Sequence, residues 1–439
     1  MEEDIRAYES SPLSPTKTTE RVDKRLEEAI EKASNRLKFE SAHDEELLYA
    51  LSVVGEFIKR KKRVCYGGTA MNAILPKAKQ FYDPQVDLPD YDFYTPDVET
   101  DVEELVQDLN KAGFKDVYHK VGIHAGTKKI LVNFVAVADV SSIEEDLFNV
   151  LLKRSILKDG MHYTDENILR MMMYLELSRP KGMVERWTKV FERLQLINQL
   201  FPIRACGAAG AAKKPPTIPL EARRAILDYI IEWQRILCNG PVTSLYTQGI
   251  RHGNAKFRVQ EGGPLLFTSP DPRIDALTLK KQLRNEGITL FRHVARGEIV
   301  PERIELRKDG VTLCVIVQET ACHSYVSVPL SDGRSIYIGS LEFLITLYLS
   351  LSIFTTHVDE ILGGRVLCQV KRFIELSNEN YAAKSSQFPP FSLQCRGHQV
   401  QFASLLRQKV SRIQKEKEKG EKATKRTSRS TKTRKRKQV

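Results

Sequence analysis

The chain is 439 residues long, with 41% apolar and 8% aromatic residues and a formal net charge of +12. This length predicts two domains, and the apolar content excludes a wholly disordered chain. No apolar run reaches the roughly 18 residues of a membrane span, and the acidic N-terminus lacks the apolar segment of a signal peptide, so an intracellular protein without a membrane partner is expected.

The positive charge lies at the C-terminus. Residues 407–439 hold 15 Lys and Arg against 3 Asp and Glu, which is the whole net charge of +12 and leaves residues 1–406 neutral. The end of this segment has almost no apolar side chains and cannot bury enough surface to fold. We expect a disordered basic tail that contacts a polyanion. The alternatives are a localisation signal and a solvated tail that only improves solubility.

The cysteines give no sign of a covalent or metal framework. There are seven, without a CxxC pair or a nearby Cys/His quartet. This pattern argues against both disulfides and a structural zinc site, and predicts reduced, mostly buried thiols.

Helical and strand signals begin after a loose N-terminus. Residues 1–22, rich in Ser, Thr, Pro and charge, predict a disordered leader. A helix is expected after Ser41–Asp44, because apolar residues then recur at three- and four-residue steps as far as Ile58. Val64–Tyr66 predicts a short strand, which a glycine turn and a short helix ended by Pro76 follow.

The next segment alternates between strands and helices. Asp90–Thr95 has the alternation and aromatic content of a strand, and the capping box Thr100–Glu103 predicts the start of a helix. Ile130–Asp139 is expected to be one long, mostly buried strand. Amphipathic helices are predicted near 165–177 and 183–199. This mixture predicts an α+β or α/β fold.

A stretch of small residues and prolines divides the chain. Residues 205–219 are expected to be a linker between one domain at 23–204 and another at 220–406. The second domain contains two hairpin signals, one of them at Asp309–Gly310, and then the apolar helix 341–354. Strands followed by a helix loosely echo the first half without a fixed period, so an internal duplication is only a hypothesis.

Asp90 and Asp92 are the first candidates for chemistry. On a strand, residues two apart project from the same face, about 7 Å apart along the chain. Adjacent carboxylates repel each other, and a divalent Mg²⁺ or Mn²⁺ ion, which prefers oxygen ligands, relieves that repulsion. Alone, an Asp-X-Asp pattern also fits an exposed strand end with solvated acids.

A glycine pair lies upstream, at the predicted junction of a strand and a helix. Gly67 and Gly68 let the backbone approach a phosphate, the helix N-terminus directs N–H groups toward an anion, and Thr69 adds a hydroxyl donor. A lone Gly-Gly is usually just a turn. A glycine turn followed by a two-aspartate strand is a rarer combination, and it indicates phosphate binding.

Asp139 is the candidate for a third carboxylate, which a two-metal site takes from a neighbouring strand. It is the only acidic residue between Asp116 and Glu144 and ends the predicted buried strand. A charge there is unfavourable unless it is paired or binds a metal. The alternative is that Asp139 caps the turn that follows.

These features together resemble a known superfamily. A Gly-Gly-Thr turn, an Asp-X-Asp strand and one Asp on the next long strand are similar to the polymerase-beta nucleotidyltransferases. The residue sequence of these motifs more specifically resembles the poly(A) polymerase catalytic subunits of large nucleocytoplasmic DNA viruses, over most of residues 40–360. The segments that carry this resemblance are Tyr66–Pro76, Pro89–Tyr94, Gly126–Phe134 with Ala138 and Asp139, Tyr174–Gly182 and, less strongly, Glu319–Tyr325.

The resemblance implies template-independent addition of AMP from ATP to an mRNA 3′ end. Asp90 and Asp92 would hold both metal ions, Asp139 would hold the ion that activates the 3′ hydroxyl, and Gly67–Thr69 would grip the triphosphate. Lys181 is a further nucleotide-binding candidate. With Arg186 it could contact phosphate or RNA, and a solvated helix start is the alternative.

The resemblance also implies that the second domain is a degenerate nucleotidyltransferase copy used for RNA handling and dimerisation. Consistently, residues 220–400 contain no Asp-X-Asp after a Gly-Gly turn. A homodimer and a location in cytoplasmic viral factories or virions are further implications. Two other functions stay open: a terminal nucleotidyltransferase of different nucleotide specificity, and a non-catalytic RNA-binding subunit that retains the fold.

Overall fold

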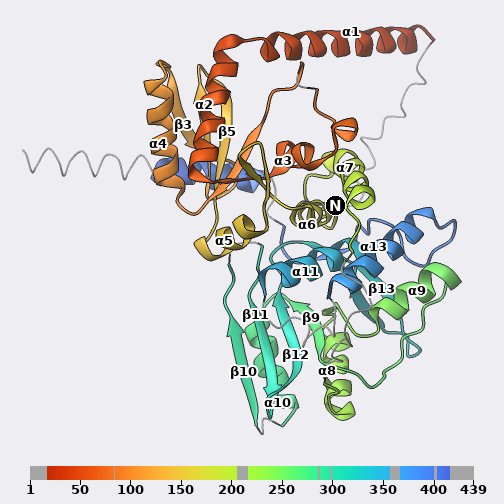
Figure 1. Cartoon of the computed structure of the whole chain (residues 1–439). Coiled ribbons are helices and arrows are strands. Elements are labelled where there is room, and N and C mark those ends of the chain that lie inside the picture. The colour runs from red at the N-terminus through yellow and green to blue at the C-terminus, as the bar shows by residue number, and fades with distance from the viewer. Residues whose placement is uncertain are drawn as a thin grey trace, which may run out of the picture.

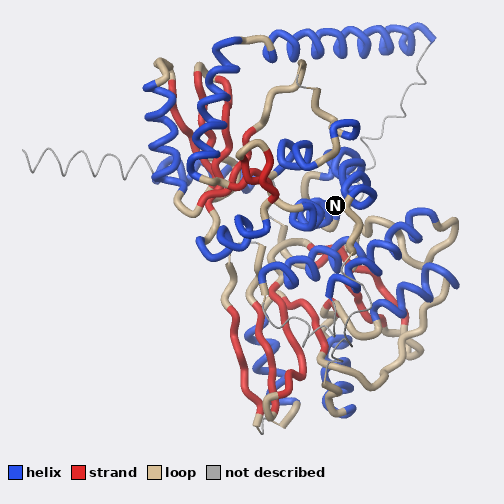
Figure 2. The backbone as a smooth tube through the Cα atoms, viewed as in Figure 1, coloured by secondary structure: helices blue, strands red, loops and turns tan. Residues whose placement is uncertain are grey.

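The computed structural model shows two β-sheets with helices packed around them (Figure 1, Figure 2). In the described part of the chain, no helix is long and apolar enough to cross a membrane. The residues that the structure describes are 17–83, 85–204, 216–284, 287–296, 299–355, 366–399 and 403–415.

The first half is built on a mixed sheet. Its strands run in the order β3 (Val117–Val121), β4 (Thr127–Val132), β5 (Val135–Ser142), β2 (Tyr91–Thr95), β1 (Val64–Cys65), β7 (Met161–Tyr163) and β6 (Ile156–Lys158). Its helices are α1 (Lys17–Ala42), α2 (Glu45–Lys61), α3 (Gly67–Ile74), α4 (Val98–Lys111), α5 (Glu145–Arg154), α6 (Glu166–Leu177) and α7 (Trp187–Leu200), with 3₁₀ turns at Lys77–Lys79 and Val184–Arg186.

The second half is built on another mixed sheet. Its strands run in the order β10 (Ile288–His293), β11 (Arg303–Lys308), β12 (Val311–Gln318), β9 (Leu265–Ser269), β8 (Ile236–Leu237), β14 (Ser335–Gly339), β13 (His323–Pro329) and β15 (Cys395–Arg396). Its helices are α8 (Leu220–Glu232), α9 (Val242–His252), α10 (Pro272–Gln282), α11 (Leu341–Phe354) and α13 (Val366–Ala382).

The two sheets repeat one topology. The central strands β1 and β2 are antiparallel, as are β8 and β9, and each pair is flanked by parallel neighbours, β7 and β5 in the first sheet and β14 and β12 in the second. Each sheet then adds an antiparallel hairpin on the outer side, β4–β3 and β11–β10. The hypothesis of an internal duplication is therefore confirmed.

Individual hydrogen bonds repeat as well. Tyr66 N–H donates to the Asp92 carbonyl at 2.9 Å, and Cys238 N–H donates to the Leu266 carbonyl at 2.8 Å. Because both bonds join the first central strand to the second, Leu266 occupies in the second sheet the place that Asp92 occupies in the first. The strand register then matches Asp139, the partner of Asp92, with Val315, the partner of Leu266.

The two halves meet through α6 and α11, which pack against each other between the sheets (Figure 1). One buried apolar cluster includes Leu177 of α6 and Phe343 of α11. After β15 the chain returns to the first half as a helical segment, 403–415. There the Arg412 guanidinium donates to the carbonyl of Ile123 at 2.8 Å.

The predicted long strand at 130–139 is wrong. The segment forms a hairpin instead, with β4 ending at Val132 and β5 starting at Val135. Asn133 and Phe134 both have positive φ, as a two-residue turn of a twisted hairpin requires. The apolar character of Phe134 hid this turn from the pattern, although its side chain is 76% exposed. Asp139 therefore lies inside β5 and not at a strand end.

Other local predictions also need correction. The capping box at Thr100 is wrong, because α4 starts earlier and the Asp97 carboxylate accepts the Thr100 N–H. Helix α1 begins at Lys17, inside the predicted leader, and residues 407–415 of the predicted tail are helical. The rest of both segments, and most of the predicted linker, lie outside the described residues. The domain boundaries stay a prediction.

The prediction that all thiols are reduced is also wrong. Cys322 and Cys395 form a disulfide, with Cα atoms 5.3 Å apart. Pairing of β13 with β15 brings the two residues together, since Ser324 is the register partner of Cys395. A sequence without a disulfide spacing pattern gives no sign of such a contact between distant segments.

Candidate active site

Asp92 and Asp139 lie side by side on β2 and β5, two neighbouring parallel strands of the first sheet. Asp92 on β2 and Asp139 on β5 are register partners, and neighbouring strands of a sheet are about 4.8 Å apart. Asp90 directly precedes β2. Burial, with the nearby carboxylates of Asp90 and Asp139, raises the pKa of Asp92 to about 7, and the cations Lys129 and Arg186 act in the opposite direction. The predicted carboxylate set is therefore brought together.

Lys129 is the cation nearest to this set that the sequence reasoning did not single out. It faces Asp139 from β4, and its ammonium lies 2.7 Å from Asp139 Oδ1. That oxygen is buried and accepts no hydrogen bond from the described residues. Lys129 thus compensates the charge of Asp139, for which the described residues provide no other ion-pair partner.

Gly67 has to be a glycine for two reasons. Its φ of +73° is unfavourable for other residues. A Cβ at this position would also lie 2.7 Å from Asp92 Oδ2. The turn therefore holds the backbone of α3 directly against the carboxylate, as the sequence analysis expected for a phosphate-binding turn beside the aspartates.

Thr69 contacts the backbone of Asp90. Its hydroxyl donates to the Asp90 carbonyl at 2.8 Å and accepts the Asp90 N–H at 3.1 Å. Its single proton is thus engaged within the protein, and the side chain joins α3 to the start of β2. Phosphate binding by Thr69 stays a prediction, and the structure gives it the further task of positioning Asp90.

Gly68 lies beneath an aromatic and basic cap. A Cβ here would collide with the Tyr82 hydroxyl and lie 3.1 Å from Arg193 Nη1. The Arg193 guanidinium is 4.4 Å from the Phe81 ring centroid, and its Nη2 donates to the Tyr82 hydroxyl at 3.3 Å. These contacts join α7 to the segment between α3 and β2, which no sequence pattern indicated.

A ladder of hydroxyl groups continues from the carboxylates along the same sheet. The Ser141 hydroxyl lies 2.9 Å from both the Tyr66 hydroxyl and the Thr127 hydroxyl. Burial raises the pKa of Tyr66, so its phenol stays protonated. Its ring stacks on Tyr94 at 4.1 Å between centroids. This neutral, rigid wall fixes the shape of the site and adds no further charge.

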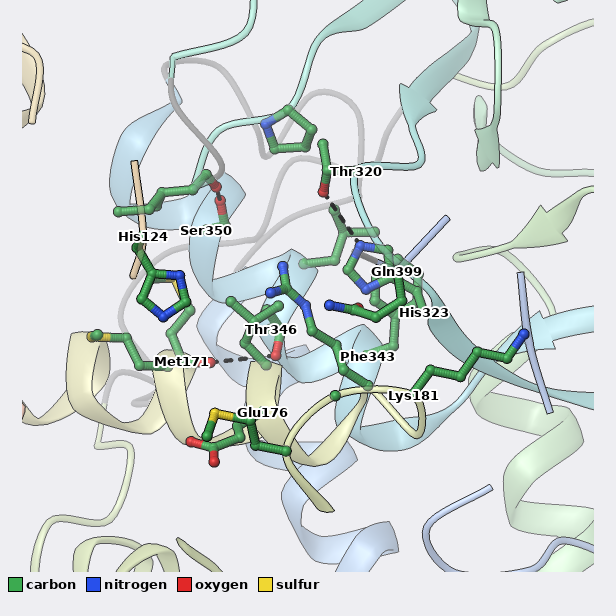
Figure 3. A pocket seen from close by; sticks show the side chains of 18 of the residues that line it. His124, Met171, Glu176, Lys181, Thr320, His323, Phe343, Thr346, Ser350 and Gln399 are labelled. Carbon is green, nitrogen blue, oxygen red and sulfur yellow. Dashed lines mark hydrogen bonds between the residues drawn. The ribbon is translucent and has the colours of Figure 1, made fainter. Parts of the chain in front are cut away.

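A cavity of about 440 Å³ opens between the two halves (Figure 3). Met171 and Phe343 contribute apolar surface from α6 and α11, and His323 stacks on Phe343 at 4.4 Å between ring centroids. The His323 ring is 6% exposed, and its Nδ1 has no hydrogen-bond partner among the described residues. Burial lowers the pKa of His323 to about 3, so the imidazole is neutral.

Lys181 lies in the wall of this cavity and not beside the carboxylates. The described lining residues include Lys181 and Arg186 but none of the three aspartates. Arg186 connects the two regions, because its charge acts on Asp92 and its Nε lies 3.5 Å from Glu176 Oε1 at the cavity wall. The role of Lys181 in nucleotide binding stays a prediction.

The carboxylates are suited to a cation without forming a complete site for one. Within the described residues, no three His, Cys, Asp or Glu side chains gather closely enough to hold a metal ion unaided. The raised pKa of Asp92 and the buried Asp139 oxygen nevertheless indicate negative charge that the protein compensates only through Lys129 and Arg186. Oxygen donors of this kind fit Mg²⁺ or Mn²⁺.

Comparison with known proteins supports the resemblance predicted from the motifs. Residues 52–183 match the family model "Poly(A) polymerase catalytic subunit". A putative poly(A) polymerase catalytic subunit of African swine fever virus is 27% identical over 206 residues, which cover 45% of this chain and 40% of that protein. One from Acanthamoeba polyphaga mimivirus is 30% identical over 157 residues, which cover 35% and 26%. The chain thus spans less than half the length of these relatives.

The fold is shared with a solved structure. The crystal structure of the Megavirus polyadenylate synthase superposes with a TM-score of 0.71, over 94% of this chain and 86% of that one, at 18% identity. The predicted α+β fold is therefore confirmed. The resemblance to viral poly(A) polymerase catalytic subunits is confirmed as well.

Proposed function

We propose that the chain is a template-independent polynucleotide adenylyltransferase that adds AMP from ATP to RNA 3′ ends. The observation that carries this proposal is the register pairing of Asp92 with Asp139, beside Asp90 and the Gly67 turn. This arrangement lies inside the segment that matches the viral catalytic-subunit family, 52–183.

Asp90, Asp92 and Asp139 would hold Mg²⁺ or Mn²⁺. A pair of such ions, when bound, stabilises the attacking and leaving oxygens of phosphoryl transfer. The charge that the three carboxylates concentrate is the reason for this assignment, because burial and mutual repulsion make an ionised Asp92 unfavourable in the free chain. Binding of a cation and movement of Lys129 away from Asp139 would then be coupled.

The remaining groups would bind and orient the substrates. The first turn of α3 at Gly67 and Gly68 directs N–H groups toward the triphosphate, and Thr69 fixes Asp90. Lys181 and Arg186 would contact phosphate. In the reaction, the RNA 3′ hydroxyl gives up its proton to solvent and its oxygen bonds to the α-phosphorus of ATP. The bond from the α-phosphorus to the bridging oxygen of the β-phosphate breaks, and pyrophosphate leaves with that electron pair.

The same proposal includes the binding partners of the chain and its location. The substrates would be an RNA 3′ end and ATP, the basic tail 407–439 would contact the RNA as a polyanion, and the chain would act as a homodimer. Both named relatives come from large DNA viruses. We extend this to a location in viral factories or virions.

The test is primer extension on a short labelled RNA, with each of the four NTPs supplied separately and with Mg²⁺ or Mn²⁺. We expect ATP-dependent ladders that fall by about a thousandfold or more in the double variant Asp90→Asn, Asp92→Asn. Asparagine keeps the side-chain size, so circular dichroism of the variant serves as the folding control. Extension with UTP would change the substrate, and retained RNA binding without extension would favour a non-catalytic subunit.

A further inference from the structure

A strip of positive charge lies along helix α7, beside the carboxylates. Lys189 and Arg193 are four residues apart on α7, and Arg186 precedes the helix by one residue, so the three lie along one side. The Arg186 side chain is 53% exposed, Lys189 is exposed and Arg193 is half-buried. With Lys38 of α1 we call these residues the α7 strip.

The cations of the α7 strip are close enough to repel one another. The pKa of Lys189 is lowered, first by the charge of Arg193 and then by burial, by Arg186 and by Lys38. Asp87 acts weakly in the opposite direction. Such repulsion is unfavourable in the free protein, and a bound polyanion relieves it.

Acidic side chains do not neutralise the strip from within the described chain. Lys189 and Arg193 form no ion pair with any described carboxylate, and Arg186 has one at 3.5 Å, with Glu176. Several other half-buried arginines do have such a partner, as Arg63 has Asp101 and Arg235 has Asp275. The strip therefore differs from an ordinary solvated helix face with alternating charges.

The strip starts at the proposed catalytic residues. The charge of Arg186 acts on Asp92, and Arg193 lies over Gly68. Figure 1 shows α3 and α7 next to each other on the same side of the first half. A strand lying on the strip would thus lie beside the carboxylates.

Aromatic rings accompany the cations. Phe81 and Tyr82 are half-buried, meet edge to face at 4.7 Å between centroids, and both lie against the Arg193 guanidinium. Basic grooves with aromatic rings are typical of single-stranded nucleic acid binding, where phosphates meet cations and bases stack. The structure therefore combines both elements of that mode.

The length of the strip favours a chain of phosphates over one group. Residues 186 to 193 span about 10 Å at 1.5 Å per residue, and Lys38 adds a cation on another helix. We infer that the α7 strip, with Phe81 and Tyr82, binds the backbone of the RNA strand whose 3′ end is extended. This inference rests on the proposed function. The competing source of phosphate is the ATP triphosphate.

The experiment measures RNA binding without catalysis. Fluorescence anisotropy of a short fluorescein-labelled oligo(A) RNA is compared for the wild type, Lys189→Glu, and Lys189→Gln with Arg193→Gln, without NTP. We expect Kd to rise by about tenfold in the variants, and the slope of log K against log salt to decrease by about 0.7 for each lost contact. Because Lys189 is exposed, its variant keeps the test valid if loss of Arg193 harms folding.

A matched control removes the same charge elsewhere. Arg273 and Lys281 are exposed on α10 of the second half, and the variant Arg273→Gln, Lys281→Gln should leave Kd within about twofold. An equal rise in Kd in this control would mean that net charge alone explains the effect, and it would overturn the inference.

The KM for ATP distinguishes the two candidate ligands of the strip, the RNA backbone and the ATP triphosphate. A raised KM with unchanged RNA affinity would assign the strip to the triphosphate, and no change in either quantity would leave it without a ligand. Each of these results overturns the inference. If instead the variants lose RNA affinity while the wild type extends no primer, the proposed function fails and the RNA site stands.

Discussion

The first half and the second half start their sheets in the same way. A partly buried arginine precedes the first central strand in each half, Arg63 before β1 and Arg235 before β8. It pairs with an aspartate in the first turn of the helix after the second central strand. Those aspartates, Asp101 and Asp275, are 1% and 2% exposed. The repeated ion pair therefore belongs to the construction of the fold.

The two halves differ where the carboxylates lie. The places of Asp90, Asp92 and Asp139 are taken in the second sheet by Pro264, Leu266 and Val315. There the side chain of Asn239 donates to the Pro264 carbonyl and accepts the Leu266 N–H, which closes the site with neutral bonds. The fold thus forms without the three acids, and the proposed function accounts for their unfavourable charge in the first half.

The largest expected effect tests the shared part of the comparison. Replacing Arg235 by Met removes the ion-pair partner of the buried Asp275, and this variant should lose about 3 to 5 kcal/mol of unfolding free energy. Arg63→Met should lose less, because the Lys61 ammonium still lies 3.3 Å from Asp101 Oδ1. Urea unfolding measures it. A loss below about 1 kcal/mol in Arg235→Met would mean that water reaches Asp275, and it would contradict the structural role given to this ion pair.

The next effect separates the halves. Gly67 and Gly240 both have positive φ, so alanine at either position should destabilise by about 1 to 2 kcal/mol. Because only the Gly67 Cβ would meet a carboxylate, Gly67→Ala should also reduce primer extension by about a hundredfold, and Gly240→Ala should not. Rates are compared per folded molecule. Equal rates in the two variants would contradict the assignment.

The smallest effect concerns pH. Because the pKa of His323 is lowered to about 3 from its usual 6.5, the unfolded chain binds a proton between these values and the folded chain does not. Stability should therefore decrease as pH falls below 6.5, by about 2 kcal/mol at pH ~5, and His323→Gln should remove this part.

The control for that measurement is in the first half. His162 of β7 is only partly buried, and its Nδ1 lies 2.8 Å from the Ser155 hydroxyl, so His162→Gln should change the pH dependence less. A wild-type protein and a His323→Gln variant whose stabilities differ equally at pH values of about 5 and 7 would show that the imidazole is already solvated in the fold.

Local chemistry made much of the first half predictable. The glycine turn before a short helix, the strand at Tyr91–Thr95 and the helix after Asp44 follow from residue type and periodicity. The resemblance supplied the role of Asp139, since its pairing with Asp92 joins strands that are distant in sequence. Register between such strands depends on packing that no local pattern records.

The remaining features depend on contacts between segments. The turn at Asn133–Phe134 was hidden in an apolar run, and the duplication has a common strand order but no common sequence period. The position of Lys129 depends on its strand partner Asp139, and the position of Arg193 depends on the Phe81 ring that it lies against. Their residue types alone indicate only solvated charge.

The helical segment 403–415 provides a second connection between the two halves. The chain passes from the first half to the second between α7 and α8, and returns after β15 to bind the β3–β4 turn through Arg412. Each connection holds one half at high effective concentration beside the other. A protease that cuts one of them would therefore leave two fragments that remain associated.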